Sequence, residues 1–141
     1  MLAIDYGRRR IGLALSDELR MTACPLATLE RTNRRSDVRR LRELARKHAV
    51  RQIVVGWPLH LNGTVSQMAE EAARFARRVE KELGLPVELV DERLTSWAAE
   101  EAARERKRSG GKRGASADAL AAALILEDYL ESKSPRRVTK S

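Results

Sequence analysis

Short apolar runs separated by polar turns open the chain. They cover residues 1–5, 11–15 and 21–29, and each is followed by turn-forming or charged residues. Runs of this length, closed in this way, predict three consecutive strands with tight connections, which is an antiparallel meander. Pro25 interrupts the third run. Because proline has no backbone N–H to donate, this strand is expected at an edge of the sheet or at a bulge.

The apolar positions then change to a helical spacing. A first helix is predicted with Ser36 as its N-cap, followed by a compact strand over residues 52–56. A second helix is expected from Thr64, because Thr64 to Gln67 has the spacing of a capping box. Gly84 is expected to end this helix in the left-handed conformation. The apolar face of the second helix comprises Met68, Ala72, Phe75, Ala76, Val79 and Leu83.

The last third of the chain continues this alternation of strand and helix. Residues 87–90 predict a fifth strand, Ser96 caps a helix to about residue 107, and Ser116 caps a helix to about residue 130. Strands that alternate with helices are expected to be parallel and covered on both faces. A meander followed by such crossovers is typical of the α/β ribonuclease H-like fold, here with a five-stranded mixed sheet. Residues 1–131 are expected to form this domain, and residues 132–141 a flexible basic tail.

Charge adds a first indication of the partner. The chain has 141 residues, with 28 Lys and Arg against 20 Asp and Glu, so its formal net charge is +8. Such a surplus favours a polyanion such as a nucleic acid, with a merely well-solvated surface as the alternative. The longest apolar run has eight residues, too few for a membrane span, and no secretory signal is expected. The single cysteine, Cys24, excludes an intrachain disulfide and favours the cytoplasm.

Three acidic residues stand at the ends of predicted elements. Asp5 closes the first strand, Glu92 follows the fifth beside Asp91, and Asp118 lies in the first turn of the last helix. Each could instead start a turn or oppose the helix dipole. If they gather, their repulsion calls for a cation, and oxygen ligands suit Mg²⁺ or Mn²⁺. Zinc is disfavoured because the two histidines lie on separate elements, so water activated by a hard metal ion is the expected nucleophile.

Basic residues lie close to these acids. Arg8, Arg9 and Arg10 directly follow the first strand, and they are expected to bind phosphates. Residues 108–114 predict a mobile lid that orders on substrate, or else a solvated linker; the lid's phosphate-binding residues would be Arg108, Lys112 and Arg113. Thr64, at the start of the second helix, could bind a phosphate or belong to a rigid turn. Arg39, Arg42 and Arg46 are expected to form only a solvated helix face.

Four blocks of the sequence resemble the YqgF/RuvX family. They are residues 5–17 (DYGRRRIGLALSD), 56–64 (GWPLHLNGT), 91–96 (DERLTS) and 116–123 (SADALAAA). The family is described as ribonuclease H-like nucleases of pre-16S ribosomal RNA, similar to RuvC-type Holliday junction resolvases. The second block departs from the family at Trp57, His60 and Asn62, where Leu, Asn and Asp are usual. RuvC-type enzymes also carry a glutamate where this chain has Gly56.

The resemblance implies a metal-dependent nuclease that matures the 5′ end of pre-16S ribosomal RNA. Its catalytic residues and Mg²⁺ or Mn²⁺ ligands would be Asp5, Glu92 and Asp118, and Arg93 of the third block would join the nucleic-acid-binding residues. A resolvase of branched DNA and a non-catalytic pre-rRNA-binding module remain alternatives. The choice between Asp91 and Glu92 as second ligand, the number of metal ions, and a monomer or homodimer also stay open.

Overall fold

The computed structural model describes residues 1–17, 22–58, 62–91 and 117–132. Within these residues the strands and helices follow the predicted order, with bounds close to those expected. The helix predicted from Ser96 lies outside the described residues. The strands are β1 (Leu2–Tyr6), β2 (Arg10–Ser16), β3 (Ala23–Glu30), β4 (Ile53–Trp57) and β5 (Val87–Asp91), and the helices are α1 (Arg34–Lys47), α2 (Gln67–Leu83) and α4 (Ala117–Ser132).

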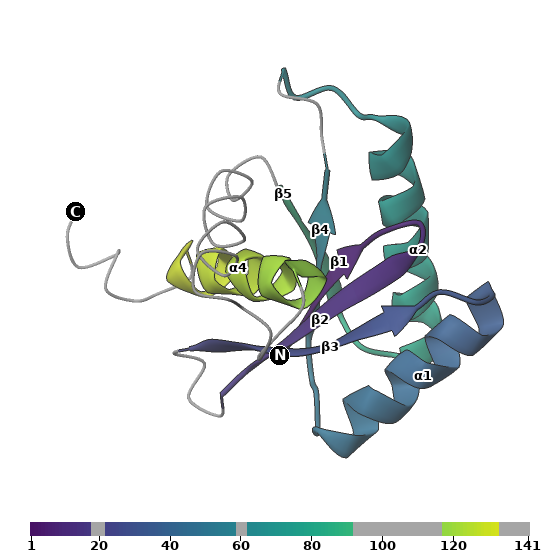
Figure 1. Cartoon of the computed structure of the whole chain (residues 1–141), viewed down its shortest axis with the longest axis vertical. Helices are drawn as coiled ribbons and strands as arrows, with labels where there is room; N and C mark the ends of the chain where they lie inside the picture. Colours follow the sequence, from purple (N-terminus) through teal and green to yellow (C-terminus); the bar gives the residue numbers. More distant parts are fainter. Residues whose placement is uncertain (18–21, 59–61, 92–116, 133–141) are drawn as a thin grey trace.

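The strands form one mixed sheet in the order β3-β2-β1-β4-β5 (Figure 1). β1, β2 and β3 pair antiparallel, which confirms the meander, whereas β1, β4 and β5 pair parallel. The third strand lies at an edge, as Pro25 predicted, and Pro25 pairs with Ala14 next to a register shift between Leu13 and Ala14. β1 is therefore the central strand, with a neighbour on each side.

Helices cover both faces of this sheet, as Figure 1 shows for α1 and α2 on one face and α4 on the other. Side chains alternate along each strand, so one strand supplies both cores. In β1, Leu2 and Ile4 pack in the core below α1 and α2, whereas Ala3 packs in the core below α4. The small Ala3 and Ala14 let the apolar helix α4 lie close to the sheet. In the described part of the chain, no helix has the length and apolar character needed to cross a bilayer.

The two predicted helix caps are wrong by a few residues. Asn33 caps α1, because its side-chain oxygen accepts the N–H of Ser36 at 2.9 Å, which places Ser36 in the first turn. Ser66 caps α2 by accepting the N–H of Ala69 at 2.9 Å, and Thr64 lies before the helix. Asn and Ser are capping residues as good as those predicted, so the choice was open locally. Gly84 does end α2 in the left-handed conformation, with φ of 70°.

Candidate active site

Asp5 lies near the carboxyl end of the central strand. Ala3, two residues before it, packs in the core below α4, so alternation along β1 places Asp5 on the same face. In the antiparallel register Asp5 is opposite Gly12 of β2. Residues directly opposite each other in such a ladder share a face. Gly12 is therefore the neighbour of Asp5 on the face of the sheet that α4 covers.

Gly12 brings the first turn of α4 to this point. A β-carbon added to Gly12 would overlap the backbone carbonyl of Asp118 and lie 3.0 Å from the N atom of Ala119. Only glycine allows this close approach of helix and strand. Since Asp5 pairs with Gly12, the start of α4 lies beside Asp5. Two of the three predicted acids, Asp5 and Asp118, are thus brought together at the carboxyl edge of the sheet.

Arg10 already neutralises one of these acids. Its Nε atom donates to Oδ2 of Asp118 at 2.9 Å, and about half of the Arg10 side chain is exposed. The hydrogen bond to Asp118, together with its negative charge, raises the pKa of the Arg10 guanidinium. Arg10 was predicted as a phosphate ligand, and in this structure its guanidinium contacts the carboxylate instead. The Asp118 carboxylate therefore already holds one cationic group, the guanidinium of Arg10.

The side chains at this point are of the kind that binds a hard divalent metal ion. Asp5 and Asp118 supply carboxylate oxygens, which Mg²⁺ and Mn²⁺ prefer. Across the part of the chain that the structure describes, no three His, Cys, Asp or Glu side chains form a group that could hold a metal. The third predicted ligand, Glu92, lies outside the described residues. The described residues thus contribute two members of the predicted set.

The neighbouring Asp91 lies on the other face of the sheet. Val90 packs in the core below α4, whereas Leu89 packs against the core of α1 and α2. Alternation along β5 places Asp91, its last residue, on the face of Leu89. Because Asp5 belongs to the α4 face, this register argues against Asp91 as a companion of Asp5.

The turn between β1 and β2 is held by ion pairs. Arg8 donates from Nε and Nη2 to the two carboxylate oxygens of Glu71 on α2, at 3.3 and 3.0 Å. The hydrogen bond from Arg8 lowers the pKa of Glu71. The side chain of Arg9 is exposed, and its carbonyl accepts the N–H of Arg31 at 2.9 Å. The three arginines predicted as one group therefore have three different environments.

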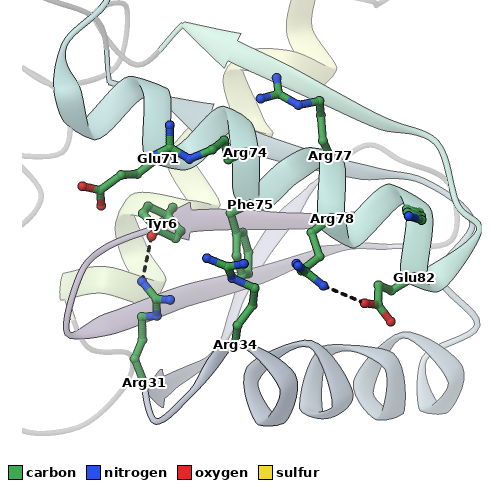
Figure 2. A pocket seen from close by; sticks show the side chains of 10 residues that line it. Tyr6, Arg31, Arg34, Glu71, Arg74, Phe75, Arg77, Arg78 and Glu82 are labelled. Carbon is green, nitrogen blue, oxygen red and sulfur yellow. Dashed lines mark hydrogen bonds and ion pairs between the residues drawn. The ribbon is translucent and has the colours of Figure 1, made fainter.

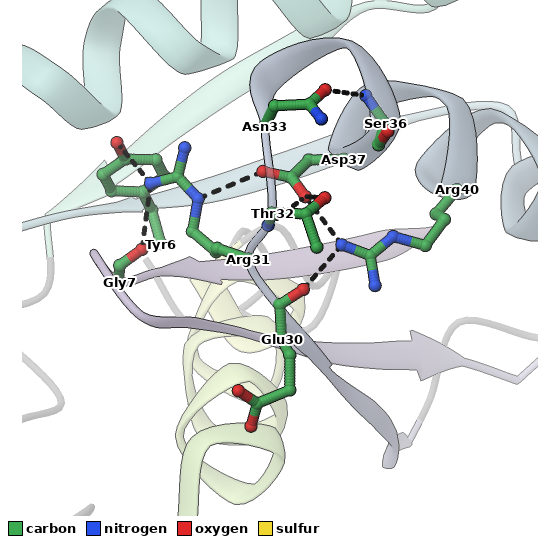
Figure 3. A network of polar contacts seen from close by, with 9 residues as sticks. All are labelled: Tyr6, Gly7, Glu30, Arg31, Thr32, Asn33, Ser36, Asp37 and Arg40. Atoms are coloured by element: carbon green, nitrogen blue, oxygen red, sulfur yellow. Dashed lines mark hydrogen bonds and ion pairs between the residues drawn. The ribbon is translucent and has the colours of Figure 1, made fainter.

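A buried network behind this turn was not predicted. Arg31 donates from Nη1 to Tyr6 Oη at 2.8 Å (Figure 2) and to the carbonyl of Gly7 at 3.2 Å (Figure 3). Its Nε atom donates to Asp37 at 3.2 Å, and Arg40 donates to the other oxygen of Asp37 (Figure 3). Asp37 is fully buried. The network ties the β1–β2 turn to α1, and in the sequence Arg31 looks like any other arginine of a basic stretch.

Of the remaining predicted site residues, the structure describes only Thr64. Thr64 is exposed, and both its N–H and its hydroxyl bond to the side-chain oxygen of Asn62, at 3.0 and 2.7 Å. This pattern is a local turn, one of the two alternatives for Thr64. Outside the described residues lie Glu92, Arg93, and the predicted lid with Arg108, Lys112 and Arg113.

The predicted solvated face of α1 is partly engaged. Arg42, one of its three arginines, donates to the carbonyl of Glu82 on α2 at 3.2 Å.

Comparison with known proteins identifies a family and close relatives of this chain. The family model described as "RuvX: Holliday junction resolvase" matches residues 1–132. A protein of Koribacter versatilis is 48% identical over 94% of this chain and 87% of its own length. A protein of Syntrophus aciditrophicus is 44% identical over 98% of this chain and 92% of its own length. Both carry the name "Putative pre-16S rRNA nuclease".

Two solved structures share the fold at low sequence identity. Thermus thermophilus RuvC in complex with a Holliday junction substrate has a TM-score of 0.61 at 19% identity, covering 95% of this chain and 97% of its own. A second structure of T. thermophilus RuvC has a TM-score of 0.54, also at 19% identity, covering 94% and 96%. The likeness confirms the ribonuclease H-like fold that the order of strands and helices predicted.

Proposed function

This chain belongs to the RuvX family, and from that premise we propose that it is a metal-dependent nuclease that matures the 5′ end of pre-16S ribosomal RNA. One observation carries the proposal. Gly12 lets the first turn of α4 approach β2 so closely that Asp118 lies beside Asp5. Two acids from opposite ends of the chain thereby meet at the carboxyl edge, where open α/β sheets bind ligands.

Asp5, Asp118 and Glu92 would hold one or two Mg²⁺ or Mn²⁺ ions. A bound ion of this kind supplies a Lewis acid for a phosphate oxygen and lowers the pKa of water towards neutrality. The protein contributes the rigid placement of its carboxylates on a central strand and a helix start. Hydrolysis in line with the 3′ oxygen would leave a 5′-phosphate and a 3′-hydroxyl.

The arginines of the β1–β2 turn would hold the RNA. Arg10, next to Asp118, is placed to transfer its guanidinium from that carboxylate to a phosphate near the scissile bond. Arg9 is exposed beside it. Arg8 would reach RNA at the expense of its pair with Glu71. The other nucleic-acid contacts that we propose are Thr64, Arg93, Arg108, Lys112 and Arg113.

A resolvase of branched DNA is the second candidate. The matching family model is described as a Holliday junction resolvase, and the chain shares the fold of RuvC. Both activities would use the same carboxylates, so only the substrate separates them. Incubation of the pure protein with pre-16S RNA and with a four-way DNA junction, each with Mn²⁺, shows which one is cut. A protein that binds the RNA and cuts neither substrate would be the non-catalytic module.

We expect Asp5→Asn to abolish cleavage while the domain stays folded. The asparagine keeps the size of the side chain but loses the charge that a divalent ion needs. Because a charge at an acid cluster is removed, the melting temperature should hold or rise. The measurement is the single-turnover cleavage rate, together with thermal melting followed by circular dichroism.

The matched control is Asp128→Asn, which makes the same chemical change near the other end of α4. It should cleave at the wild-type rate. Wild-type cleavage by pure Asp5→Asn protein would refute the proposed site. An equal loss of activity in both variants would show an effect of net charge instead.

A further inference from the structure

A basic cavity lies on the face of the sheet opposite α4, between α1 and α2. Its volume is about 580 Å³, and Figure 2 shows the side chains that line it. Tyr6 and Phe75 are the aromatic residues of this lining. Glu71 and Glu82 are its acids, and its cations are Arg31, Arg34, Arg74, Arg77, Arg78 and Lys81. We call this cavity the α1–α2 groove.

The charges of the α1–α2 groove are not balanced. Both acids are engaged, since Glu71 pairs with Arg8 at 3.0 Å and Glu82 with Arg78 at 3.1 Å. Among the residues that the structure describes, four of the cations make no hydrogen bond or ion pair: Arg34, Arg74, Arg77 and Lys81. Clustered cations in a hollow produce a positive potential that attracts anions.

The guanidinium of Arg31, which lines the groove, is held in place by other residues of the protein before any ligand binds. Arg31 lies over the ring of Tyr6, 4.8 Å from its centre, and only 19% of its side chain is exposed. Its Nε and Nη1 atoms are held by Asp37, Tyr6 and Gly7. Its Nη2 atom makes no hydrogen bond to any described residue. A donor held in this way loses little side-chain entropy when it binds an oxyanion.

The groove begins close to the candidate active site. Tyr6 lines it, and Tyr6 directly follows Asp5 on the opposite face of β1. A second hollow of about 570 Å³ extends it along α1, sharing Arg34 and Arg78 and adding Arg35 and Arg39. The basic surface thus runs from the carboxyl edge of the sheet along the two helices.

We propose that the α1–α2 groove binds the sugar–phosphate backbone of the RNA substrate beyond the cleavage point. The inference rests on the proposed function and extends it to a second surface. The cations of α2, at residues 74, 77, 78 and 81, follow the spacing of one helix face. Three of these four cations are unpaired, and such a row matches a row of phosphates, which carry no sequence information but set the position of the chain.

The test compares the salt dependence of RNA binding. We combine Arg74→Gln with Arg77→Gln in the groove, and Lys47→Gln with Arg51→Gln as the control pair. Lys47, the last residue of α1, and Arg51, just before β4, are exposed and lie outside the groove. Both pairs remove the same charge. All proteins also carry Asp5→Asn, so that the RNA stays intact, and binding of a single-stranded pre-16S fragment is followed by fluorescence anisotropy.

Each phosphate contact contributes about 0.7 to the slope of log Kobs against log salt for single strands. The groove pair should therefore reduce that slope by about 1.4, whereas the control pair should change it much less. Equal slopes for the two pairs would overturn the inference. The proposed function is tested by a different measurement, cleavage by the wild-type protein, and it is refuted if that protein cuts no RNA. Melting curves verify that all variants are folded.

Discussion

Asp37 is a fully buried carboxylate that supports the β1–β2 turn through Arg31. Burial alone would raise the pKa of Asp37, but the backbone N–H of Thr32 and the guanidinium groups of Arg40 and Arg31 hold it below its ordinary value of 3.8. A carboxyl whose pKa is lowered by folding stabilises the native state above its ordinary pKa. That contribution is lost as the pH falls through the lower, native value.

We expect Asp37→Asn to destabilise the protein by about 2–3 kcal/mol at pH 7, because it leaves two guanidinium groups without their buried partner. The gap should begin to narrow below about pH 4, because the carboxyl of the unfolded chain then takes up a proton, and it should close as the pH falls through the lower native pKa of Asp37. Urea unfolding at pH 7 and at pH 2.5 measures both values. The control Asp128→Asn, at a half-buried position of α4, should differ little from wild type at either pH. A gap that is independent of pH would contradict the assigned role of the Asp37 charge.

At the scale of elements, the contact between Gly12 and the start of α4 decides where Asp118 lies. We expect Gly12→Ala to destabilise the domain by about 1–3 kcal/mol, since the new methyl group overlaps the Asp118 backbone. Moving Asp118 by about 1 Å should reduce cleavage by about a hundredfold. The readouts are urea unfolding and the single-turnover rate.

Gly84→Ala is the control for this substitution. Gly84 has φ of 70° and nothing within 4 Å of an added β-carbon. Its replacement should cost about 1 kcal/mol of stability through backbone strain. Cleavage should stay at the wild-type rate, because Gly84 ends α2 away from the acids. If both variants lost activity in proportion to stability, Gly12 would be only a structural residue.

Local patterns sufficed for most of the elements but not for their contacts. Short apolar runs and helical spacing, with Pro25 and Gly84, predicted the strands, the edge strand and the end of α2. The caps of α1 and α2 were misplaced because several residues that can cap a helix stand next to each other. The roles of Gly12 and Arg31 depend on segments far away in the sequence, so a linear reading had no signal for them. The sequence predicted that Asp5 and Asp118 lie at the ends of a strand and a helix, whereas it did not predict the pairing of Arg10 with Asp118.

At the scale of the whole molecule, α4 runs from the carboxyl edge of the parallel strands, where Asp118 lies, to their amino edge, where Tyr129 makes hydrogen bonds. Asp118 lies in the first turn of the helix, at the carboxyl edge of the sheet where Asp5 also lies. Near its other end Tyr129 accepts from Gln52 at 3.0 Å and donates to Glu88 at 2.9 Å. Gln52 directly precedes β4, and Glu88 is the second residue of β5, so both partners lie at the amino end of the parallel strands.

We expect Tyr129→Phe to lower the free energy of unfolding by about 1 kcal/mol, the usual contribution of a hydrogen bond in a partly buried place. The cleavage rate should be unchanged well below the melting temperature, because the acids are at the opposite end of the helix. Urea unfolding and the single-turnover rate provide the two measurements. A large loss of rate in a stable Tyr129→Phe protein would show that the two ends are coupled.

In the ion pair between Arg10 and Asp118, each side chain occupies the group that a ligand of the candidate site would need. Under the proposed function, a divalent ion that takes Asp118 releases a guanidinium, and a phosphate that takes the guanidinium releases a carboxylate. Each ligand thus removes the competitor of the other. Linkage requires this help to be mutual, so the ion should bind more tightly with RNA present, and RNA more tightly with the ion. The result is an enzyme that assembles its reactive centre chiefly when a substrate is there to be cut.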